Sequence, residues 1–136
     1  MARITVSHRF GEAFDIQIRG CRLISDEPVT VGGEDEGPTP TELIVAVLAA
    51  CAAEEGVNYL TRRGLPNDRF EVKADFAWDS RASRVDAVRI TVERPPQLEE
   101  EDMRSLEAAV LDCPARKMLT EPPAVEYSFS DAAARA

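Results

Sequence analysis

The fold is decided by residues 37–56, whose sequence is GPTPTELIVAVLAACAAEEG. The start of this stretch has the pattern of a capping box, with Thr39 at the N-cap, Pro40 at the first helical position and Glu42 at the third. The helix should continue to residues 62–63, because two arginines there suit the negative end of the helix dipole and a glycine follows them. We therefore expect one helix of about 24 residues, roughly 36 Å long.

This predicted helix contains an apolar stretch with no polar face, from Leu43 to Ala53. A helix that is apolar all round must be covered on every side, which one small sheet from one chain can hardly achieve. The stretch is also shorter than the roughly 18 apolar residues that span a membrane. The sequence therefore predicts an intertwined homodimer, in which the sheet of each chain covers the helix of the other, and no membrane span.

Alternating apolar and polar residues predict strands on both sides of this helix. Runs of strands that do not alternate with helices indicate an α+β fold with antiparallel sheets. The chain of 136 residues has the length of one domain, so we expect a single domain over 1–136. The expected strands are 3–7, 14–18, 21–25, 70–78, 88–92 and 125–129, and two shorter helices are expected at 99–110 and 113–119.

The composition is typical of a soluble globular protein, with 44% hydrophobic and 30% charged residues. Twenty-five acidic and sixteen basic residues give a formal net charge of −9, which argues against binding to nucleic acids or anionic membranes. The first residues lack the pattern of a signal peptide, so we expect a cytoplasmic protein whose thiols stay reduced. With one histidine and no Cys-x-x-Cys motif, no metal site is expected.

The three cysteines are then either inert core residues or reactive groups. Cys113 precedes Pro114, which places it at the N-cap of a helix, where unpaired N–H groups favour a thiolate; the alternative is a small buried residue beside a proline. Cys51 lies in the middle of the apolar helix, where burial alone would raise its pKa and leave it inert. It can be a nucleophile only if a cation lies within about 4 Å. Cys21 is expected in a strand as a small core residue.

Glu42 has two interpretations, a helix cap or a site residue. It precedes Cys51 by nine residues, or about two and a half turns, so the two side chains point to opposite faces of the helix. Contact between them would therefore run through a substrate or a partner chain.

Together these features resemble the OsmC/Ohr family. The resemblance rests on residues 37–43, on the alanine-rich helix with Cys51 in its middle, and on Cys113 with Pro114 about sixty residues later. It covers about residues 3–130. It implies an intertwined dimer of antiparallel sheets around long central helices. The better-known members of the family are thiol-dependent reductases of hydroperoxides.

By this resemblance, Cys51 is the peroxidatic cysteine, whose thiolate becomes a sulfenic acid, and Cys113 is the resolving cysteine that forms a disulfide with it. An external dithiol then reduces the disulfide, and in parts of the family this is a protein-bound dihydrolipoyl group. No cofactor is bound. The arginine that holds the thiolate is Arg9, because Arg9 begins an Arg-x-Gly hairpin turn, and Arg19 is the second choice.

The resemblance leaves two functions open. The first is a thiol peroxidase in oxidative-stress defence, acting more readily on organic hydroperoxides because the helix around Cys51 is apolar. The second is a non-enzymatic OsmC-like dimer that binds a small apolar ligand in the cleft between the subunits. The second is motivated by the glutamate of the site: hydroperoxide reductases of the family often have it directly after the helix-start proline, whereas here Thr41 stands there and Glu42 comes one residue later.

Overall fold

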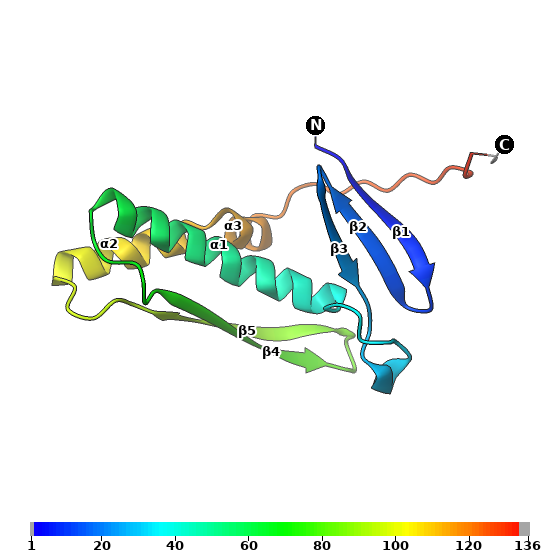
Figure 1. Ribbon diagram of the computed structural model, residues 1–136, viewed down its shortest axis with the longest axis horizontal. Helices are drawn as coiled ribbons and strands as arrows, with labels where there is room; N and C mark the ends of the chain where they lie inside the picture. The colour runs from blue at the N-terminus through cyan, green and yellow to red at the C-terminus, as the bar shows by residue number, and fades with distance from the viewer. Residues whose placement is uncertain (1, 134–136) are drawn as a thin grey trace.

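A three-stranded sheet, a long helix, a two-stranded hairpin and two shorter helices follow one another along the chain (Figure 1). The computed structural model describes residues 2–133. Its antiparallel sheets and long helix confirm the expected α+β class. The elements are β1 (Ile4–Phe10), β2 (Ala13–Ile18), β3 (Cys21–Ser25), a short 3-10 turn η1 (Val29–Val31), α1 (Pro40–Arg62), β4 (Glu71–Asp79), β5 (Arg84–Glu93), α2 (Glu100–Leu111) and α3 (Pro114–Thr120).

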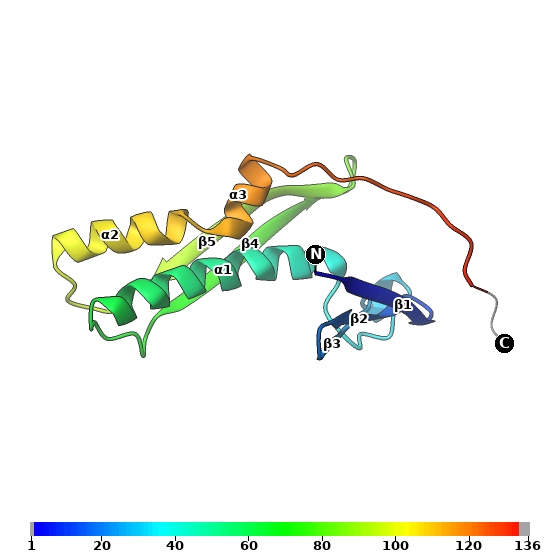
Figure 2. The ribbon, with the colours of Figure 1, turned by 90° about the horizontal axis from the view of Figure 1, so that it is seen from above.

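The N-terminal sheet has the strand order β1-β2-β3, with Ile4 opposite Ile18 and Ile18 opposite Cys21. It lies beyond the N-terminal end of α1, whereas α1 packs against α2, β4, α3 and β5 (Figures 1 and 2). Because nothing covers the outer strand, Ile4 is 59% exposed and Val6 is 58% exposed. Within one chain this sheet has little to pack against.

A buried carboxylate organises the loop between the sheet and α1. Asp26 is 1% exposed and accepts backbone N–H groups from Glu27, Glu34 and Glu36. Burial alone would raise the pKa of Asp26, but these three hydrogen bonds outweigh it and lower that pKa below its ordinary value. The same loop requires glycine at position 33, since a Cβ there would lie 1.8 Å from the carbonyl oxygen of Glu27. The loop therefore holds one conformation at the start of α1.

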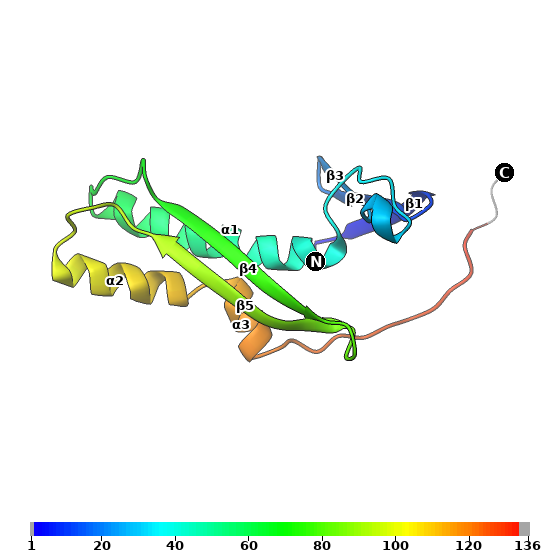
Figure 3. The same ribbon diagram turned by 90° about the horizontal axis from the view of Figure 1, so that it is seen from below.

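The helix start predicted from the sequence is confirmed. The backbone N–H of Glu42 donates to Thr39 Oγ1 at 3.1 Å, and the backbone N–H of Thr39 donates to Glu42 Oε2 at 3.0 Å, which completes the capping box. Further along, α1 packs against the β4–β5 hairpin, which crosses beneath it (Figure 3). Gly56 permits this close approach, because a Cβ there would lie 2.2 Å from Phe70 Cζ.

Much of the apolar surface of α1 is uncovered within one chain. Ile44 is 61% exposed and Val47 is 56% exposed. The most apolar 18-residue window of α1 has a mean hydropathy of 1.5, and only 22% of that window is buried. By length and composition alone such a helix could cross a membrane, a test that the core helix of a soluble protein also passes. One chain cannot cover α1, as its sequence indicated.

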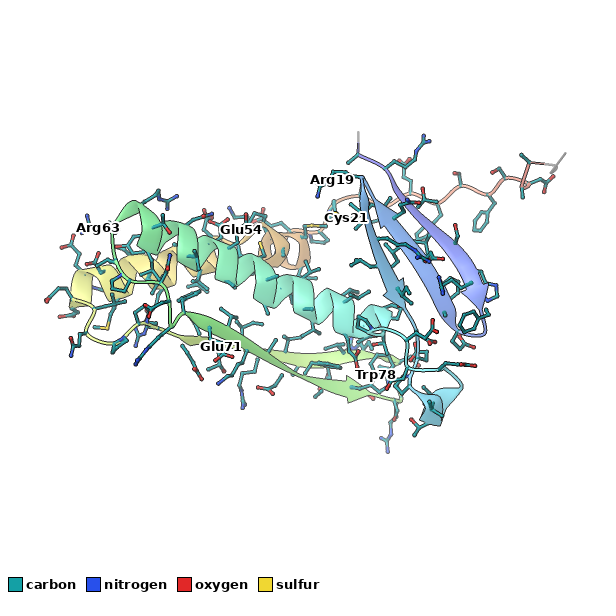
Figure 4. The ribbon with its side chains drawn as sticks, in the orientation of Figure 1. Arg19, Cys21, Glu54, Arg63, Glu71 and Trp78 are labelled. Atoms are coloured by element: carbon teal, nitrogen blue, oxygen red, sulfur yellow. The ribbon has the colours of Figure 1, made fainter. Side chains whose placement is uncertain are left out.

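Two details of the sequence prediction are wrong. Residues 125–129, expected as a strand, pair with neither sheet of the described residues, and Phe129 is 96% exposed. Their apolar alternation is that of a strand, but the segment runs away from the rest of the chain and meets no free sheet edge (Figure 2). Cys21, expected in the core, is exposed, because within residues 2–133 little packs against the faces of the N-terminal sheet (Figure 4).

A second buried carboxylate joins α2 to α1. Asp102 accepts a hydrogen bond from Tyr59 Oη, in the last turn of α1, at 2.7 Å and another from Nε of Arg63, the C-cap residue of α1, at 3.1 Å. The bond from Tyr59 lowers the pKa of Asp102, burial opposes this, and the Arg63 guanidinium adds to the lowering. The folded state therefore favours the ionised form of Asp102.

We expect Asp102→Asn to lower the midpoint of thermal unfolding at pH 7, because the amide keeps the shape of the side chain but removes the charged acceptor. The pKa of Asp102 is lower in the folded than in the unfolded chain. Its contribution to stability is thus fully present above the ordinary carboxyl pKa and is lost as the pH falls through the lowered one. In thermal scans the gap between wild type and variant should shrink towards acid pH. A gap of constant size would contradict this, and the exposed Glu101→Gln is the matched control.

Candidate active site

The structure brings Cys51 and Cys113 together. Cys113 raises the pKa of the Cys51 thiol as a hydrogen-bonding neighbour, and neither is in a disulfide. Cys51 is half-buried on α1, whereas Cys113 is 2% exposed at the start of α3. A disulfide between them would require their Cα atoms to lie within about 7 Å.

The short helix α3 positions Cys113 and also contacts Cys51. Cys113 is the N-cap residue and Pro114 is the first helical residue, as expected from the sequence. The side chain of Cys113 makes no capping hydrogen bond. The backbone N–H of Ala115 instead donates to the sulfur of Cys51. The helix start, which the sequence suggested would stabilise a thiolate of Cys113, thus directs a donor to Cys51.

The surroundings of Cys51 in one chain favour its protonated form. Burial raises the pKa of the Cys51 thiol, the hydrogen bond with Cys113 raises it further, and the charge of Glu55 adds to the rise. The N–H of Ala115 opposes these effects. Arginine and lysine are not among the groups with the largest effects on this thiol. The net effect of residues 2–133 of one chain is thus to raise the pKa of Cys51 above its ordinary value.

Arg9 belongs to a separate cluster of charges on the N-terminal sheet. Its Nη1 lies 3.2 Å from both carboxylate oxygens of Asp15, and its Nη2 lies 3.8 Å from Glu36. Arg22 pairs with the same carboxylate of Asp15. This sheet lies beyond the N-terminal end of α1, whereas α3 lies beside the middle of that helix (Figure 2). Arg19, the second choice, is exposed in the turn between β2 and β3 (Figure 4). Neither arginine approaches the thiols within one chain.

Glu42 lies apart from the thiols as well. Its carboxylate is engaged in the capping box, and nine residues of helix put it about 13 Å along the axis from Cys51. Of the four site residues predicted from the sequence, Cys51 and Cys113 are neighbours within one chain, whereas Glu42 lies in the first turn of α1 and Arg9 lies on β1, in the sheet beyond that turn.

A cavity of about 710 Å³ lies beside Cys113, between α1, β5, α2 and α3. This volume is within the range of small-molecule sites. Cys113 lines the cavity and Cys51 does not, while Arg116 supplies a positive charge. Sequence reasoning missed this cavity, because its wall is assembled from four elements distant along the chain. The apolar lining includes Leu48, Val88, Ile90, Leu106 and Val110.

Sequence reasoning also missed Glu55. It follows Cys51 by four residues on α1, a spacing that places two side chains on one face of a helix. The four-residue spacing could have identified Glu55 as a neighbour of Cys51 from the sequence. As for metals, no cluster of three or more His, Cys, Asp or Glu side chains that could hold an ion occurs within residues 2–133.

Solved structures share this fold at low sequence identity. A protein from Psychrobacter arcticus described as an osmotic stress induced and detoxification response protein has 18% identity and a TM-score of 0.79, with 90% of each chain covered. An OsmC-like protein from Mycoplasma pneumoniae has 12% identity and a TM-score of 0.74, with 89% of this chain and 88% of that one covered. The organic hydroperoxide resistance protein OhrB of Bacillus subtilis has 20% identity and a TM-score of 0.57, with 89% and 91% covered.

No curated protein matches the chain. The family model described as OsmC-like protein matches residues 33–128, which include the helix start, both thiols of the pair and the cavity. Since this match extends over more than half of the sequence and agrees with the fold, the chain belongs to the OsmC-like family.

Proposed function

We propose that this protein is a thiol-dependent peroxidase that reduces organic hydroperoxides through Cys51 and Cys113. Family membership supports a role in peroxide defence, as does a fold shared with proteins named for organic hydroperoxide resistance. The observation that carries the proposal is that Cys113, a buried thiol at the start of α3, is a near enough neighbour of the half-buried Cys51 to raise the pKa of its thiol.

The proposed reaction has three steps. The sulfur of Cys51 attacks the terminal oxygen of the hydroperoxide, the O–O bond breaks, and a sulfenic acid and an alcohol form. The thiol of Cys113 then condenses with the sulfenic acid, releasing water and forming a disulfide. An external dithiol, free or on a lipoylated protein, reduces that disulfide and is itself oxidised. No bound cofactor takes part in this sequence.

The proposal includes a homodimer that completes the site. Burial raises the pKa of Cys51 within one chain, so a cation must reach it from elsewhere. We propose that Arg9 of the second chain, with Glu42 near it, supplies this charge, and that Arg19 is the alternative. The uncovered face of α1 and the extended residues 125–129 support such an assembly. A membrane or a nucleic acid is not among the proposed partners, and the proposed compartment is the cytoplasm.

The first test is the disulfide. One equivalent of cumene hydroperoxide should reduce the intact mass of the reduced protein by about two mass units, with Cys51 and Cys113 linked in the peptide map. Cys113→Ser should instead stop at a sulfenic acid of Cys51 that a dimedone reagent traps. Cys21→Ser, which changes an exposed thiol on the N-terminal sheet, should behave as wild type. Unmodified thiols in the wild type under excess hydroperoxide would exclude the proposed reaction.

The second test is turnover with a dithiol such as dihydrolipoamide. Cys51→Ser should reduce hydroperoxide consumption to the uncatalysed background, because the attacking sulfur is lost. Cys113→Ser should lose dithiol-dependent turnover but keep one round of oxidation. Cys21→Ser again serves as the control, with a rate within about twofold of wild type.

The third test concerns the assembly. Light scattering on a sizing column should give a dimer, because a monomer would leave the apolar face of α1 in water. Val47→Asp should shift the protein towards monomer, while Ala108→Asp on the exposed side of α2 should not. If the dimer forms, the dissociated Val47→Asp variant should also lose peroxidase activity. A wild-type monomer with full activity would refute the shared site.

A second function is favoured by one observation, the apolar cavity of about 710 Å³. In that case the protein is a non-enzymatic dimer that binds a small apolar ligand, in this cavity or in the cleft between subunits. Cys51→Ser should then leave both ligand binding and the cellular role intact. Loss of peroxide protection in cells carrying Cys51→Ser would decide for the enzyme.

A further inference from the structure

The cavity of about 710 Å³ borders one thiol of the pair and not the other. Cys113 lines it, together with residues of α1, β5, α2 and α3, whereas Cys51 does not. Cys113 is buried from bulk water, while Cys51 is half-buried and keeps part of its surface outside the cavity. A molecule held in the cavity would therefore meet Cys113 first, and a molecule that arrives from outside would meet Cys51 first.

The wall of the cavity is largely apolar. Ala52 of α1 and Leu106 of α2 are buried in this wall, whereas Leu111 and Leu119 line the same cavity and remain exposed to water. Covering exposed leucines removes apolar surface from water, which stabilises a complex. The volume also lies within the roughly 300–1,000 Å³ of small-molecule sites. The cavity therefore suits a ligand with an apolar body.

The charged side chains of the lining set the preferred charge of such a ligand. Arg94 is paired, since its Nη1 lies 2.9 Å from Oε1 of Glu107, and both residues line the cavity. Arg116 donates from Nη1 to the backbone carbonyl oxygen of Leu111 at 3.4 Å, and within residues 2–133 it forms no ion pair. One guanidinium of the lining is thus available to a ligand, and it favours an anionic or neutral end over a cationic one.

The proposed reaction cycle needs two external molecules at different stages. The hydroperoxide reacts with Cys51 while both thiols are reduced, and the part of Cys51 outside the cavity is open to it. The reductant reacts later, with a disulfide, and it could attack either sulfur. Of these two residues, Cys113 is the one that borders a cavity of ligand size. Separate approaches would let the oxidant and the reductant reach the thiols without competing for one site.

We propose that this cavity admits the reductant, a dithiol on an apolar chain with a neutral or anionic end, and that the reductant attacks the sulfur of Cys113. The inference rests on the proposed peroxidase function. A thiolate of the reductant bonds to the sulfur of Cys113, the Cys51–Cys113 bond breaks, and Cys51 leaves and takes up a proton. The second thiol of the reductant then attacks the reductant's own sulfur in this mixed disulfide, which releases Cys113 as a thiol and the reductant as a cyclic disulfide. Two electrons and two protons pass from the dithiol to the cysteines.

A monothiol traps the first of these steps, because it has no second thiol to resolve the mixed disulfide. Oxidised protein is mixed with mercaptohexanol, quenched with iodoacetamide at the earliest times and mapped by peptide mass. We expect the mercaptohexanol adduct on Cys113 and the carbamidomethyl group on Cys51. The reverse arrangement would overturn the proposal.

The oxidised protein is prepared in two ways, with cumene hydroperoxide and with diamide, which links neighbouring thiols without a peroxide. If the hydroperoxide forms no disulfide, the peroxidase function fails, and the diamide sample still reports which sulfur a thiol attacks. If the hydroperoxide forms the disulfide but the adduct lies on Cys51, the peroxidase function stands and the entry site fails. If neither oxidant links the two cysteines, both fail.

Filling the cavity should slow this trapping step. Val110 lines the cavity, so Val110→Trp should reduce the rate of adduct formation by roughly tenfold. Ala108→Trp on the exposed side of α2 is the matched control and should stay within about twofold of wild type. Alkylation of reduced Cys51 by iodoacetamide should be unchanged in both variants, which shows that they are folded. Equal adduct rates in the two variants would contradict the proposal.

The charge of the lining gives a second variant that leaves the packing of the cavity almost intact. Arg116→Gln should slow trapping by the anionic mercaptohexanoate by about two- to fivefold, the effect of one exposed ion pair, and leave mercaptohexanol within about twofold. Arg104→Gln removes an exposed arginine of α2 that does not line the cavity and should affect neither thiol. A change that is the same for both thiols, or none for either, would overturn the assignment of this cavity to the reductant.

Discussion

The apolar surface of α1 is the constraint on which the rest of the structure depends. A helix that carries Ile44 and Val47 on a face left 61% and 56% exposed must find a cover, because each buried Å² of apolar surface contributes about 25 cal/mol. The chain offers only partial cover. The β4–β5 hairpin, α2 and α3 pack on one side of α1, while the N-terminal sheet lies beyond its end. The proposed dimer would cover this apolar face of α1. It would also put the two thiols in a site that residues of both chains form.

The arrangement of the two thiols depends on the start of α3. Pro114 starts α3 directly after Cys113, and the first turn of α3 directs the N–H of Ala115 at the sulfur of Cys51. One short element thus supplies both the second thiol and a hydrogen-bond donor to the first. Burial and the charge of Glu55 act against the thiolate. The site of one chain therefore favours the protonated thiol of Cys51, and the proposed cation from the second chain would counter this effect.

Sequence reasoning succeeded for features that neighbouring residues determine and failed for features that depend on partners distant in the sequence. The capping box at Thr39 and Glu42 and the hairpin of β4 and β5 were predictable, since neighbours in sequence determine them. Residues 125–129 have the alternation of a strand but meet no free sheet edge in one chain. Cys21 was misplaced because alternation identifies a strand without saying what packs against the faces of its sheet. Such errors arise wherever the partner of an element decides its burial.

The sequence by itself determined the order of the elements as far as α3, the start and end of α1, the apolar character of that helix, and the positions of the cysteines along the chain. These follow from local hydrogen bonding, from proline and glycine geometry and from apolar periodicity. Only the tertiary structure decided that Cys51 and Cys113 meet, that Ala115 donates to Cys51, and that a cavity opens beside Cys113. These depend on how α3 packs against α1, and such packing is set by side chains sixty residues apart in the sequence that no local pattern relates.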